Sequence, residues 1–338
     1  MRPEAMIAFV REALGLPAPV DLALRSLGGR GSDRTYFRVR WNPGGSAILV
    51  HYDPKRVENG YYPDIALFLE EIRIPVPHLL RHDPVACLIV MEDLGDTDLW
   101  AMRGAPRETR HALYRKTLAA VHRLHAFPVA DFPSDGPRLM EGFGPALYRW
   151  ERDYFRTHLV RDVCGIDLGL RAGQALEDEL SALAERIGEG ATCLVHRDLQ
   201  SQNVMIRREE PFLIDFQGMR LGSPFYDLGS LLCDPYVDLS AGDRDDLLTF
   251  YYALSPRDVD WVAFRTRFWE ASVQRLMQAL GAYGFLGLKK GLSHFFAHIP
   301  AGLGKLVAAT GQVTSLPLLK ALAARCASAW DQRAPEGP

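Results

Sequence analysis

The chain has 338 residues, of which 48% are hydrophobic, and its formal net charge is -3. This length suits one large domain or two smaller ones, and the charge balance provides no general basic field for binding nucleic acid. No apolar run is long enough for a membrane span, and the first 17 residues mix charged and apolar side chains like an amphipathic helix, unlike a signal peptide. Five scattered cysteines without a CxxC pair favour a cytoplasmic protein with buried thiols and argue against a structural zinc site.

The first ninety or so residues favour β-strands with one helix. Short runs rich in apolar and β-forming residues occur at 22–27, 35–41 and 47–52, with Gly-rich breaks between them. The run 61–72 indicates the helix, and 86–95 indicates another strand that ends in a polar turn. We therefore expect a small β-rich lobe over residues 1–95.

The pattern changes to helical spacing after this point. Apolar residues recur at the helical period in 108–127, 146–160 and 172–187, and a Pro-containing loop separates the first two of these segments. Two short strands follow, and the remainder is helical again, from 245 to 333. We expect residues 96–338 to form a larger, mostly helical lobe.

A densely polar segment lies between apolar ends in "LVHRDLQSQNVMI", residues 194–206. Asp198 and Asn203 are five residues apart in it, and Asp215 ends the apolar run of "FLIDFQ". If the two flanking strands pair as a hairpin, Asn203 and Asp215 project from neighbouring strand ends toward one point. A carboxylate and an amide oxygen suit Mg²⁺, and Asp198 is placed to accept the proton of an attacking hydroxyl. The plainer alternative is a polar turn that bonds to its own backbone.

The same residues carry a family resemblance. "HRDLQSQN" matches the H-R-D-L-x-x-x-N catalytic loop of protein kinases, and "IDFQ" stands where that fold has D-F-G. Only eleven residues separate Asp215 from Asp227, and no A-P-E motif follows. The sequence therefore resembles the small-molecule branch of the kinase-like phosphotransferases, which includes aminoglycoside phosphotransferases and choline kinases. The resemblance covers most of the chain, to about Leu306.

This resemblance implies a bilobal, protein-kinase-like α+β fold with a small antiparallel sheet and one main helix in its N-lobe. ATP and Mg²⁺ are expected between the lobes. The resemblance implies that Asp198 is the catalytic base and that Asn203 and Asp215 are the Mg²⁺ ligands. The γ-phosphate would go to a hydroxyl of a small polar molecule.

The substrate class is suggested by further runs. "DFQ", "YDLGSLLCDPYV" and "VQRLMQALG" resemble the anomeric amino-sugar kinases of cell-wall recycling, which implies N-acetylmuramate or N-acetylglucosamine as the acceptor. A polycationic aminoglycoside would need an acidic pocket, and the C-terminal helices carry mainly arginines and lysines, including Arg275. A solvated helix face is the plainer interpretation of these cations. Candidate sugar contacts are Trp150, Tyr154 and Gln217.

The nucleotide site is suggested by two segments. "GGRGSDRTYF" resembles a phosphate-covering loop, in which the residues nearest the phosphates would be Gly29, Gly31 and Ser32. "VMEDLG" resembles the interlobe hinge that receives adenine on its backbone, at Glu92 and Leu94. The lysine that normally lies on the strand after the loop is missing. His51 occupies the approximate position, and other possible cations are Arg34, Arg38 and Lys55.

Two alternatives stay open at this point. The nearest is another small-molecule kinase, acting on an aminoglycoside, choline or a different sugar. The other is a nucleotide-binding regulatory protein without turnover, which the absent lysine suggests. In each case we expect a small-molecule partner, with neither nucleic acid nor a membrane, and the oligomeric state is left open.

Overall fold

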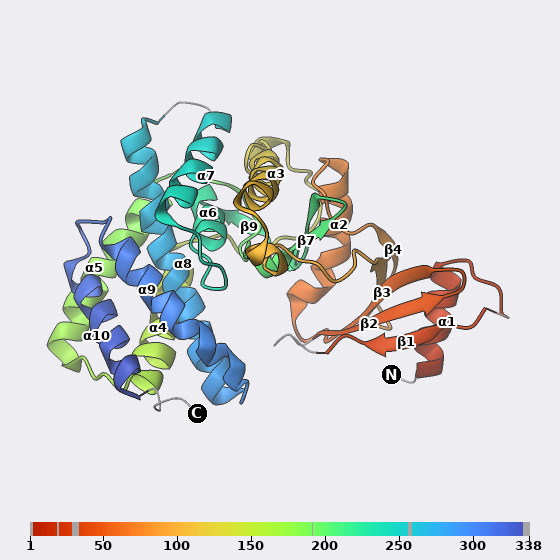
Figure 1. Cartoon of the computed structure of the whole chain (residues 1–338), viewed down its shortest axis with the longest axis horizontal. Helices are drawn as coiled ribbons and strands as arrows, with labels where there is room; N and C mark the ends of the chain where they lie inside the picture. The colour runs from red at the N-terminus through yellow and green to blue at the C-terminus, as the bar shows by residue number, and fades with distance from the viewer. Residues whose placement is uncertain (1–2, 19, 29–33, 191, 256–258, 334–338) are drawn as a thin grey trace.

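The computed structural model describes residues 3–18, 20–28, 34–190, 192–255 and 259–333. Figure 1 shows a β-rich part, which contains the N-terminal residues, beside a larger group of helices. The α+β architecture predicted from the sequence is confirmed, with an antiparallel five-stranded sheet. None of the helices in these ranges is both long and apolar enough to cross a lipid bilayer.

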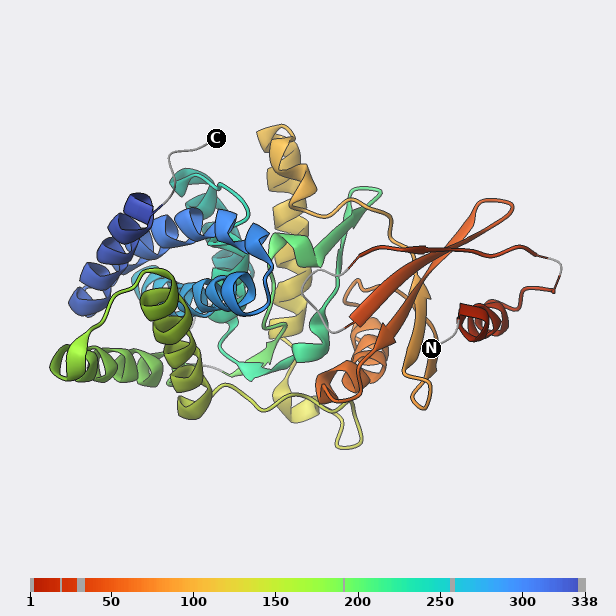
Figure 2. The same ribbon diagram turned by 90° about the horizontal axis from the view of Figure 1, so that it is seen from below.

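The sheet has the strand order β1-β2-β3-β5-β4. Its strands are β1 (Ala23–Ser26), β2 (Arg34–Trp41), β3 (Gly45–Tyr52), β4 (Leu79–Asp83) and β5 (Leu88–Glu92). The helices of this part are α1 (Pro3–Ala13), the short η1 (Val57–Tyr61) and α2 (Tyr62–Glu71). The helices α1 and α2 lie on opposite sides of the sheet (Figure 2).

The alternation of side chains along β3 explains why both faces of the sheet are covered. Ala47 and Leu49 are buried in a cluster with residues of α1. Ile48, Val50 and Tyr52 point the other way and belong to the main core, which includes α2. Successive side chains of a strand project to opposite faces, so an apolar run of this kind is buried on both sides.

The second part of the chain is mostly helical. Its long helices are α3 (Arg107–His125), α4 (Pro145–Phe155), α5 (Gly169–Gly188), α6 (Pro224–Leu232), α7 (Ala241–Leu254), α8 (Trp261–Lys289), α9 (Ile299–Thr310) and α10 (Pro317–Arg333). Its short helices are η2 (Ala101–Gly104), η3 (Val129–Asp131), the π-helix η4 (Arg156–Val163), η5 (Ser201–Asn203), η6 (Phe216–Gly218) and η7 (Ser293–His298). Four short strands complete it: β6 (Cys193–Val195), β7 (Val204–Arg207), β8 (Glu210–Leu213) and β9 (Arg220–Gly222).

Helix α8 is the central helix of this part. The Asp260 side chain caps it by accepting hydrogen bonds from the N–H groups of Val262 and Ala263, at 2.9 and 3.0 Å. A Cβ added to Gly284 would lie 2.4 Å from the carbonyl oxygen of His158, so only glycine permits this close approach of α8 to η4. A helix that is apolar around most of its circumference lies in a protein core, so the buried polar side chains of α8 are exceptions to its pattern.

Candidate active site

The loop between β6 and β7 is held by the buried side chain of Asp227. Its Oδ2 accepts a hydrogen bond from the N–H of His196 at 2.6 Å, and its Oδ1 accepts one from the N–H of Arg197 at 2.8 Å. The ring of His125 lies 3.1 Å from Oδ2, and the His196 ring lies 2.9 Å from the carbonyl oxygen of Ile214. These contacts satisfy the buried carboxylate and fix the backbone one residue before Asp198.

Strands β7 and β8 form the hairpin that the sequence predicted. Val204 pairs with Leu213, and the N–H of Ile214 donates to the carbonyl oxygen of Asn203 at 3.0 Å. Asn203 and Asp215 therefore leave neighbouring strand ends, as expected. Asp215 has a left-handed backbone conformation, with φ of 65°.

The structure brings Asp198, Asn203 and Asp215 to this hairpin end. The Asn203 Nδ2 donates to the backbone oxygen of Asp198 at 2.8 Å and lies 3.4 Å from its Oδ2. This leaves the Asn203 Oδ1 and the Asp215 Oδ2 without a partner in the part of the chain that the structure describes. Hard oxygen donors without protein partners are the chemistry that Mg²⁺ requires, so these residues fit the ion.

Arg275 is a partner of Asp198 that we did not predict from the sequence. Arg275 is 6% exposed on α8, and its Nη2 lies 2.6 Å from the Asp198 Oδ1. Its Nε donates to the Ser230 Oγ at 3.1 Å, and its Nη1 donates to Gln278. Burial alone would lower the pKa of Arg275, but Asp198 and neighbouring acidic groups together raise it above the ordinary value. Arg275 does not lie on a solvated helix face, so the plainer interpretation of this cation is wrong. The sequence did contain an indication of its burial, because Gln274, Arg275 and Gln278 are polar residues within an otherwise apolar part of the helix.

A second arginine reaches the site from the sheet. Arg34, the first residue of β2, forms an ion pair with the Asp215 Oδ1. Burial raises the pKa of Asp215, but the charge of Arg34 and the hydrogen bonds from Arg34 and Gln217 together lower it below the usual range. Gln217 completes a triangle, accepting from the Arg34 Nη1 at 2.9 Å and donating to the Asp215 Oδ1 at 2.8 Å. Both ends of the Gln217 amide are thus engaged, although we predicted it as a sugar contact.

The other candidate cations differ from Arg34 in their positions and contacts. Arg34 pairs with Tyr52 and Thr35 with His51, so Arg34 and His51 project to opposite faces of the sheet. His51 follows Leu49 on the face covered by α1, and burial lowers its pKa below the ordinary value, which favours the neutral ring. Arg38 forms ion pairs with Asp93 and Asp96, each at 2.7 Å, and Lys55 is exposed.

The predicted hinge follows β5. The N–H of Glu92 donates to the His78 carbonyl at 2.9 Å, and its side chain forms an ion pair with Arg207. Leu94 is buried, and within the described ranges its main-chain N–H and C=O make no hydrogen bond. The other predicted nucleotide contacts, Gly29, Gly31 and Ser32, lie outside the described residues.

The predicted sugar contacts Trp150 and Tyr154 form an aromatic stack on α4. Their ring centroids are 4.9 Å apart with an interplanar angle of 16°, and Trp150 is 50% exposed. Phe285 of α8 lies beside Tyr154, with a centroid distance of 5.6 Å. Burial raises the pKa of Tyr154 to about 12, while the charges of Arg56 and Arg197 lower it.

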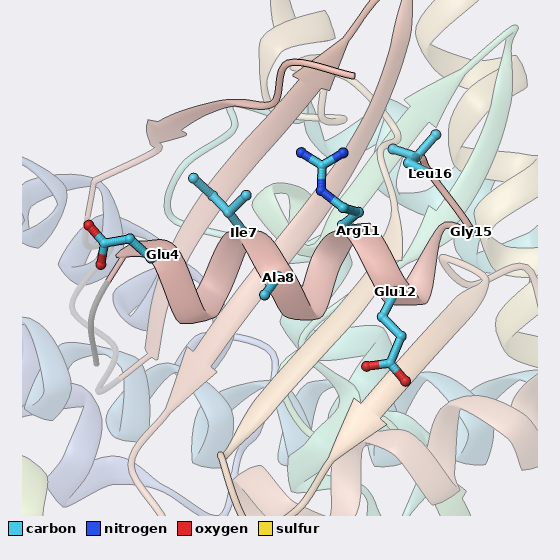
Figure 3. A pocket seen from close by; sticks show the side chains of 7 residues that line it. All are labelled: Glu4, Ile7, Ala8, Arg11, Glu12, Gly15 and Leu16. Carbon is cyan, nitrogen blue, oxygen red and sulfur yellow. The ribbon is translucent and has the colours of Figure 1, made fainter. Parts of the chain in front are cut away.

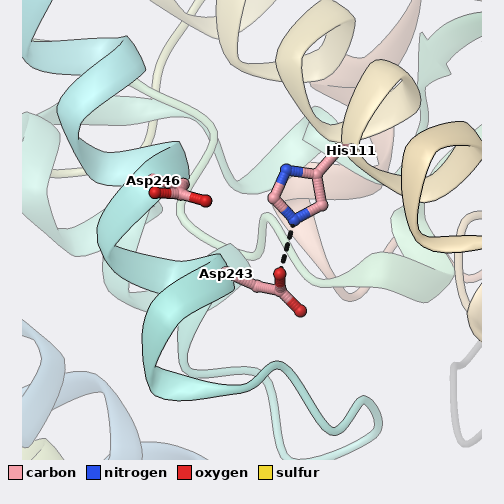
Figure 4. A group of neighbouring side chains, drawn as sticks. All are labelled: His111, Asp243 and Asp246. Carbon is pink, nitrogen blue, oxygen red and sulfur yellow. Dashed lines mark hydrogen bonds and ion pairs between the residues drawn. The ribbon is translucent and has the colours of Figure 1, made fainter.

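A different group of ionisable side chains lies between α3 and α7. His111, Asp243 and Asp246 offer ligand atoms within 4.8 Å of one another (Figure 4). Arg107 already pairs with both carboxylates, at 2.6 Å to Asp243 and 2.9 Å to Asp246, and His111 lies 2.8 Å from Asp243. The cluster is therefore an ion-pair network that joins two helices.

A hollow of about 530 Å³ on the outer side of α1 offers no comparable chemistry (Figure 3). Arg11 donates to the carbonyl oxygens of Pro17 and Val20, and Glu12 pairs with Arg81. The polar side chains that line it therefore serve the local structure, and the chemistry stays with the hairpin end of β7 and β8.

Comparisons with known proteins show the family of the chain and its fold. A family model described as "Phosphotransferase enzyme family" matches residues 23–265. The chain is 26% identical over 299 residues to an N-acetylmuramate/N-acetylglucosamine kinase of Neisseria meningitidis serogroup B, and the match covers 86% of each chain. A choline/ethanolamine kinase family protein from Mesorhizobium loti is similar in structure, with a TM-score of 0.62, 17% identity, and coverage of 96% of this chain and 99% of that one. The ADP-bound aminoglycoside phosphotransferase APH(2'')-Ib gives a TM-score of 0.58 at 14% identity, covering 92% and 100%. These likenesses confirm the predicted bilobal, kinase-like fold.

Proposed function

The chain belongs to the phosphotransferase enzyme family, and on this premise we propose that it transfers the γ-phosphate of ATP to the anomeric hydroxyl of an amino sugar, N-acetylmuramate or N-acetylglucosamine. It is an enzyme that phosphorylates a hydroxyl of a small molecule. The observation that carries the amino-sugar proposal is the match, along 86% of both chains, to a relative of that name. The half-exposed Trp150 on Tyr154 supports it, because sugars stack on aromatic faces.

In the proposed mechanism, Asp198 is the general base. Arg275 holds the Asp198 Oδ1 at 2.6 Å, which leaves Oδ2 to accept the hydroxyl proton of the sugar. The carboxylate is thereby oriented before substrate arrives, and its position does not depend on a flexible loop, since Asp227 fixes the preceding backbone.

Asn203 and Asp215 are the proposed magnesium ligands, through the two oxygens that have no protein partner in the described chain. When bound, Mg²⁺ offsets the charge of the phosphates. Since Arg34 also contacts Asp215, its guanidinium is within reach of the same phosphates. We therefore propose Arg34, in place of His51, as the cation that substitutes for the missing lysine. Leu94 is proposed to receive adenine on its unpaired main-chain groups.

A substrate panel tests the proposal. ADP release is measured with N-acetylmuramate, N-acetylglucosamine, choline and kanamycin as acceptors, with Asp198→Asn as the control for background ATP hydrolysis. We expect turnover with the N-acetylated sugars and a product that ³¹P NMR identifies as an acid-labile sugar 1-phosphate. Turnover of kanamycin or choline, with none of any sugar, would overturn the acceptor while leaving the phosphotransferase assignment intact.

A further inference from the structure

Two arginines lie next to each other beside the catalytic loop, and the proposed mechanism uses neither. Arg220 begins β9 and pairs with Val195 of β6, two residues before Arg197. Both arginines border Gly218. The Arg220 Nε donates to the Gly218 carbonyl at 3.1 Å, and a Cβ added to Gly218 would lie 3.6 Å from the Arg197 Cδ. The chain therefore gathers two cations around Gly218, and one of them, Arg197, directly precedes Asp198.

Neither arginine has a carboxylate partner in the described ranges. Arg220 is only 8% exposed, yet its Nη1 and Nη2 make no hydrogen bond there, and no carboxylate lies within 4.0 Å of either guanidinium. A buried charge without a partner is costly, so proteins retain one mainly where a ligand supplies the opposite charge. Burial, together with the charge of Arg197, lowers the pKa of Arg220 from its high ordinary value.

The nearby acid Glu151 does not neutralise the pair. It is 1% exposed, and its two oxygens accept from the Tyr226 hydroxyl at 2.7 Å and from the Gln274 Nε2 at 2.9 Å. Burial also raises the pKa of Glu151, which favours its uncharged form. Glu58 is the other acid whose charge acts on Arg220, but its ion-pair partner in the described ranges is Arg56, at 3.5 Å. Arg197 and Arg220 thus have no carboxylate in direct contact within those ranges, and an anion from outside the protein can fill that place.

The surroundings hold Arg220 in place. Its guanidinium lies 5.2 Å from the centroid of the Phe143 ring, which packs against Tyr148 and Tyr226 at centroid distances of 5.2 and 4.4 Å. A planar guanidinium held by an aromatic ring presents its outer nitrogens in a fixed direction, the arrangement that binds a carboxylate with two hydrogen bonds.

We propose that Arg197 and Arg220 form an anion subsite that receives the carboxylate of an acidic amino sugar. The inference rests on the proposed function and makes N-acetylmuramate, which carries a carboxylate, a better acceptor than the neutral N-acetylglucosamine. The acceptor is favoured over the nucleotide because Arg197 directly precedes Asp198, the proposed base. The triangle of Arg34, Gln217 and Asp215 marks the phosphate end of the site.

The test compares the two sugars in matched variants. The ratio of kcat/KM for N-acetylmuramate to that for N-acetylglucosamine is measured at saturating ATP in the wild type, in Arg220→Gln and in Arg171→Gln. Arg171 is an exposed arginine of α5 and serves as the control. Loss of a charged hydrogen-bond donor should lower the ratio roughly 10- to 100-fold in Arg220→Gln, through the KM of the acidic sugar, and leave it unchanged in Arg171→Gln.

Two further measurements guard against a misfolded Arg220→Gln variant: one uses the wild type alone, and the other checks that the variant still binds nucleotide. In the wild type, raising NaCl from about 0.05 to 0.5 M should raise the KM of N-acetylmuramate several-fold, with little effect on the KM of its neutral methyl amide. Affinity for a fluorescent ATP analogue should be the same in Arg220→Gln and wild type. A loss of ATP affinity with an unchanged sugar ratio would assign the anion to the nucleotide and overturn the inference.

The outcomes separate this inference from the proposed function. If both sugars react but the ratio is unchanged in Arg220→Gln and in Arg197→Gln, the anion subsite is wrong and the amino-sugar kinase stands. If neither sugar releases ADP, the proposed function is wrong, and the inference falls with it.

Discussion

Arg275→Met removes the guanidinium that holds Asp198 and keeps much of the apolar stem that packs in α8. In the wild type, this guanidinium contacts Asp198, Ser230 and Gln278, and the side chain of Arg275 is 7% exposed. The variant leaves the Asp198 carboxylate beside the core without its charged partner. We therefore expect loss of both stability and turnover, with a larger effect on kcat than on affinity for ATP.

The magnitude follows from the burial of the pair. Removing one partner of a fully buried ion pair costs about 3–5 kcal/mol. The Asp198 side chain is 25% exposed, so part of that cost is recovered by water, and we expect about 2–3 kcal/mol. A chain of 338 residues unfolds with an entropy of about 0.7 kcal/mol/K, so the loss corresponds to a Tm lower by roughly 3–4 °C.

A double-mutant cycle measures the contact itself. Tm and the urea midpoint are determined for Arg275→Met, Asp198→Asn and the double variant, with Arg267→Met as the control, since Arg267 lies on the same helix and has no ion-pair partner in the described chain. Because the two residues are in contact, the cost of the double variant should be smaller than the sum of the single costs. Additive costs within about 0.5 kcal/mol would refute the coupling, and unchanged kcat in Arg275→Met would refute its role in positioning the base.

Three further predictions concern the base, the nucleotide and the ion-pair network. Asp198→Asn should lower kcat by about 10²-fold or more while a fluorescent-nucleotide titration finds ATP affinity within a few-fold of wild type; near-normal turnover would contradict its role as base. Arg34→Gln should weaken ATP binding roughly tenfold, whereas the control Arg25→Gln, on the exposed strand β1, should leave it unchanged. Equal ATP affinities in the two variants would contradict the role of Arg34 and favour the other candidate cations. Burial raises the pKa of Asp243, but hydrogen bonds led by Arg107 bring it to about 2. The pKa is lower in the folded state, so this contribution to stability is present above about pH 4 and is lost as pH falls toward 2. The difference in Tm between wild type and Asp243→Asn should become smaller as the pH is lowered from 5 to 3. A Tm difference that does not change with pH would exclude a contribution of the Asp243 carboxylate to the pH dependence of stability.

The parts of the fold that depend on local interactions could be predicted from the sequence. The hairpin of β7 and β8 joins residues only a few positions apart, and the motif around Asp198 and Asn203 has a fixed spacing, so its geometry could be predicted. Strand β4, at Leu79–Asp83, was not predicted, because its polar residues hide the alternation that marks a strand. The π-helix Arg156–Val163 was predicted as part of one continuous helix, since a π-turn has the same apolar spacing within a single turn.

The sequence by itself indicated the class of chemistry, because the proposed base Asp198 and the proposed magnesium ligands Asn203 and Asp215 lie within one short segment with a recognisable spacing. It also determined the two-part α+β organisation, which follows from the change of hydrophobic period after residue 95. The partners of those catalytic groups were decided by the tertiary structure alone. Arg275 is 77 residues from Asp198, and Arg34 is 181 residues from Asp215. Which arginine meets which carboxylate depends on how helices and strands pack across such separations, and no local periodicity encodes that choice.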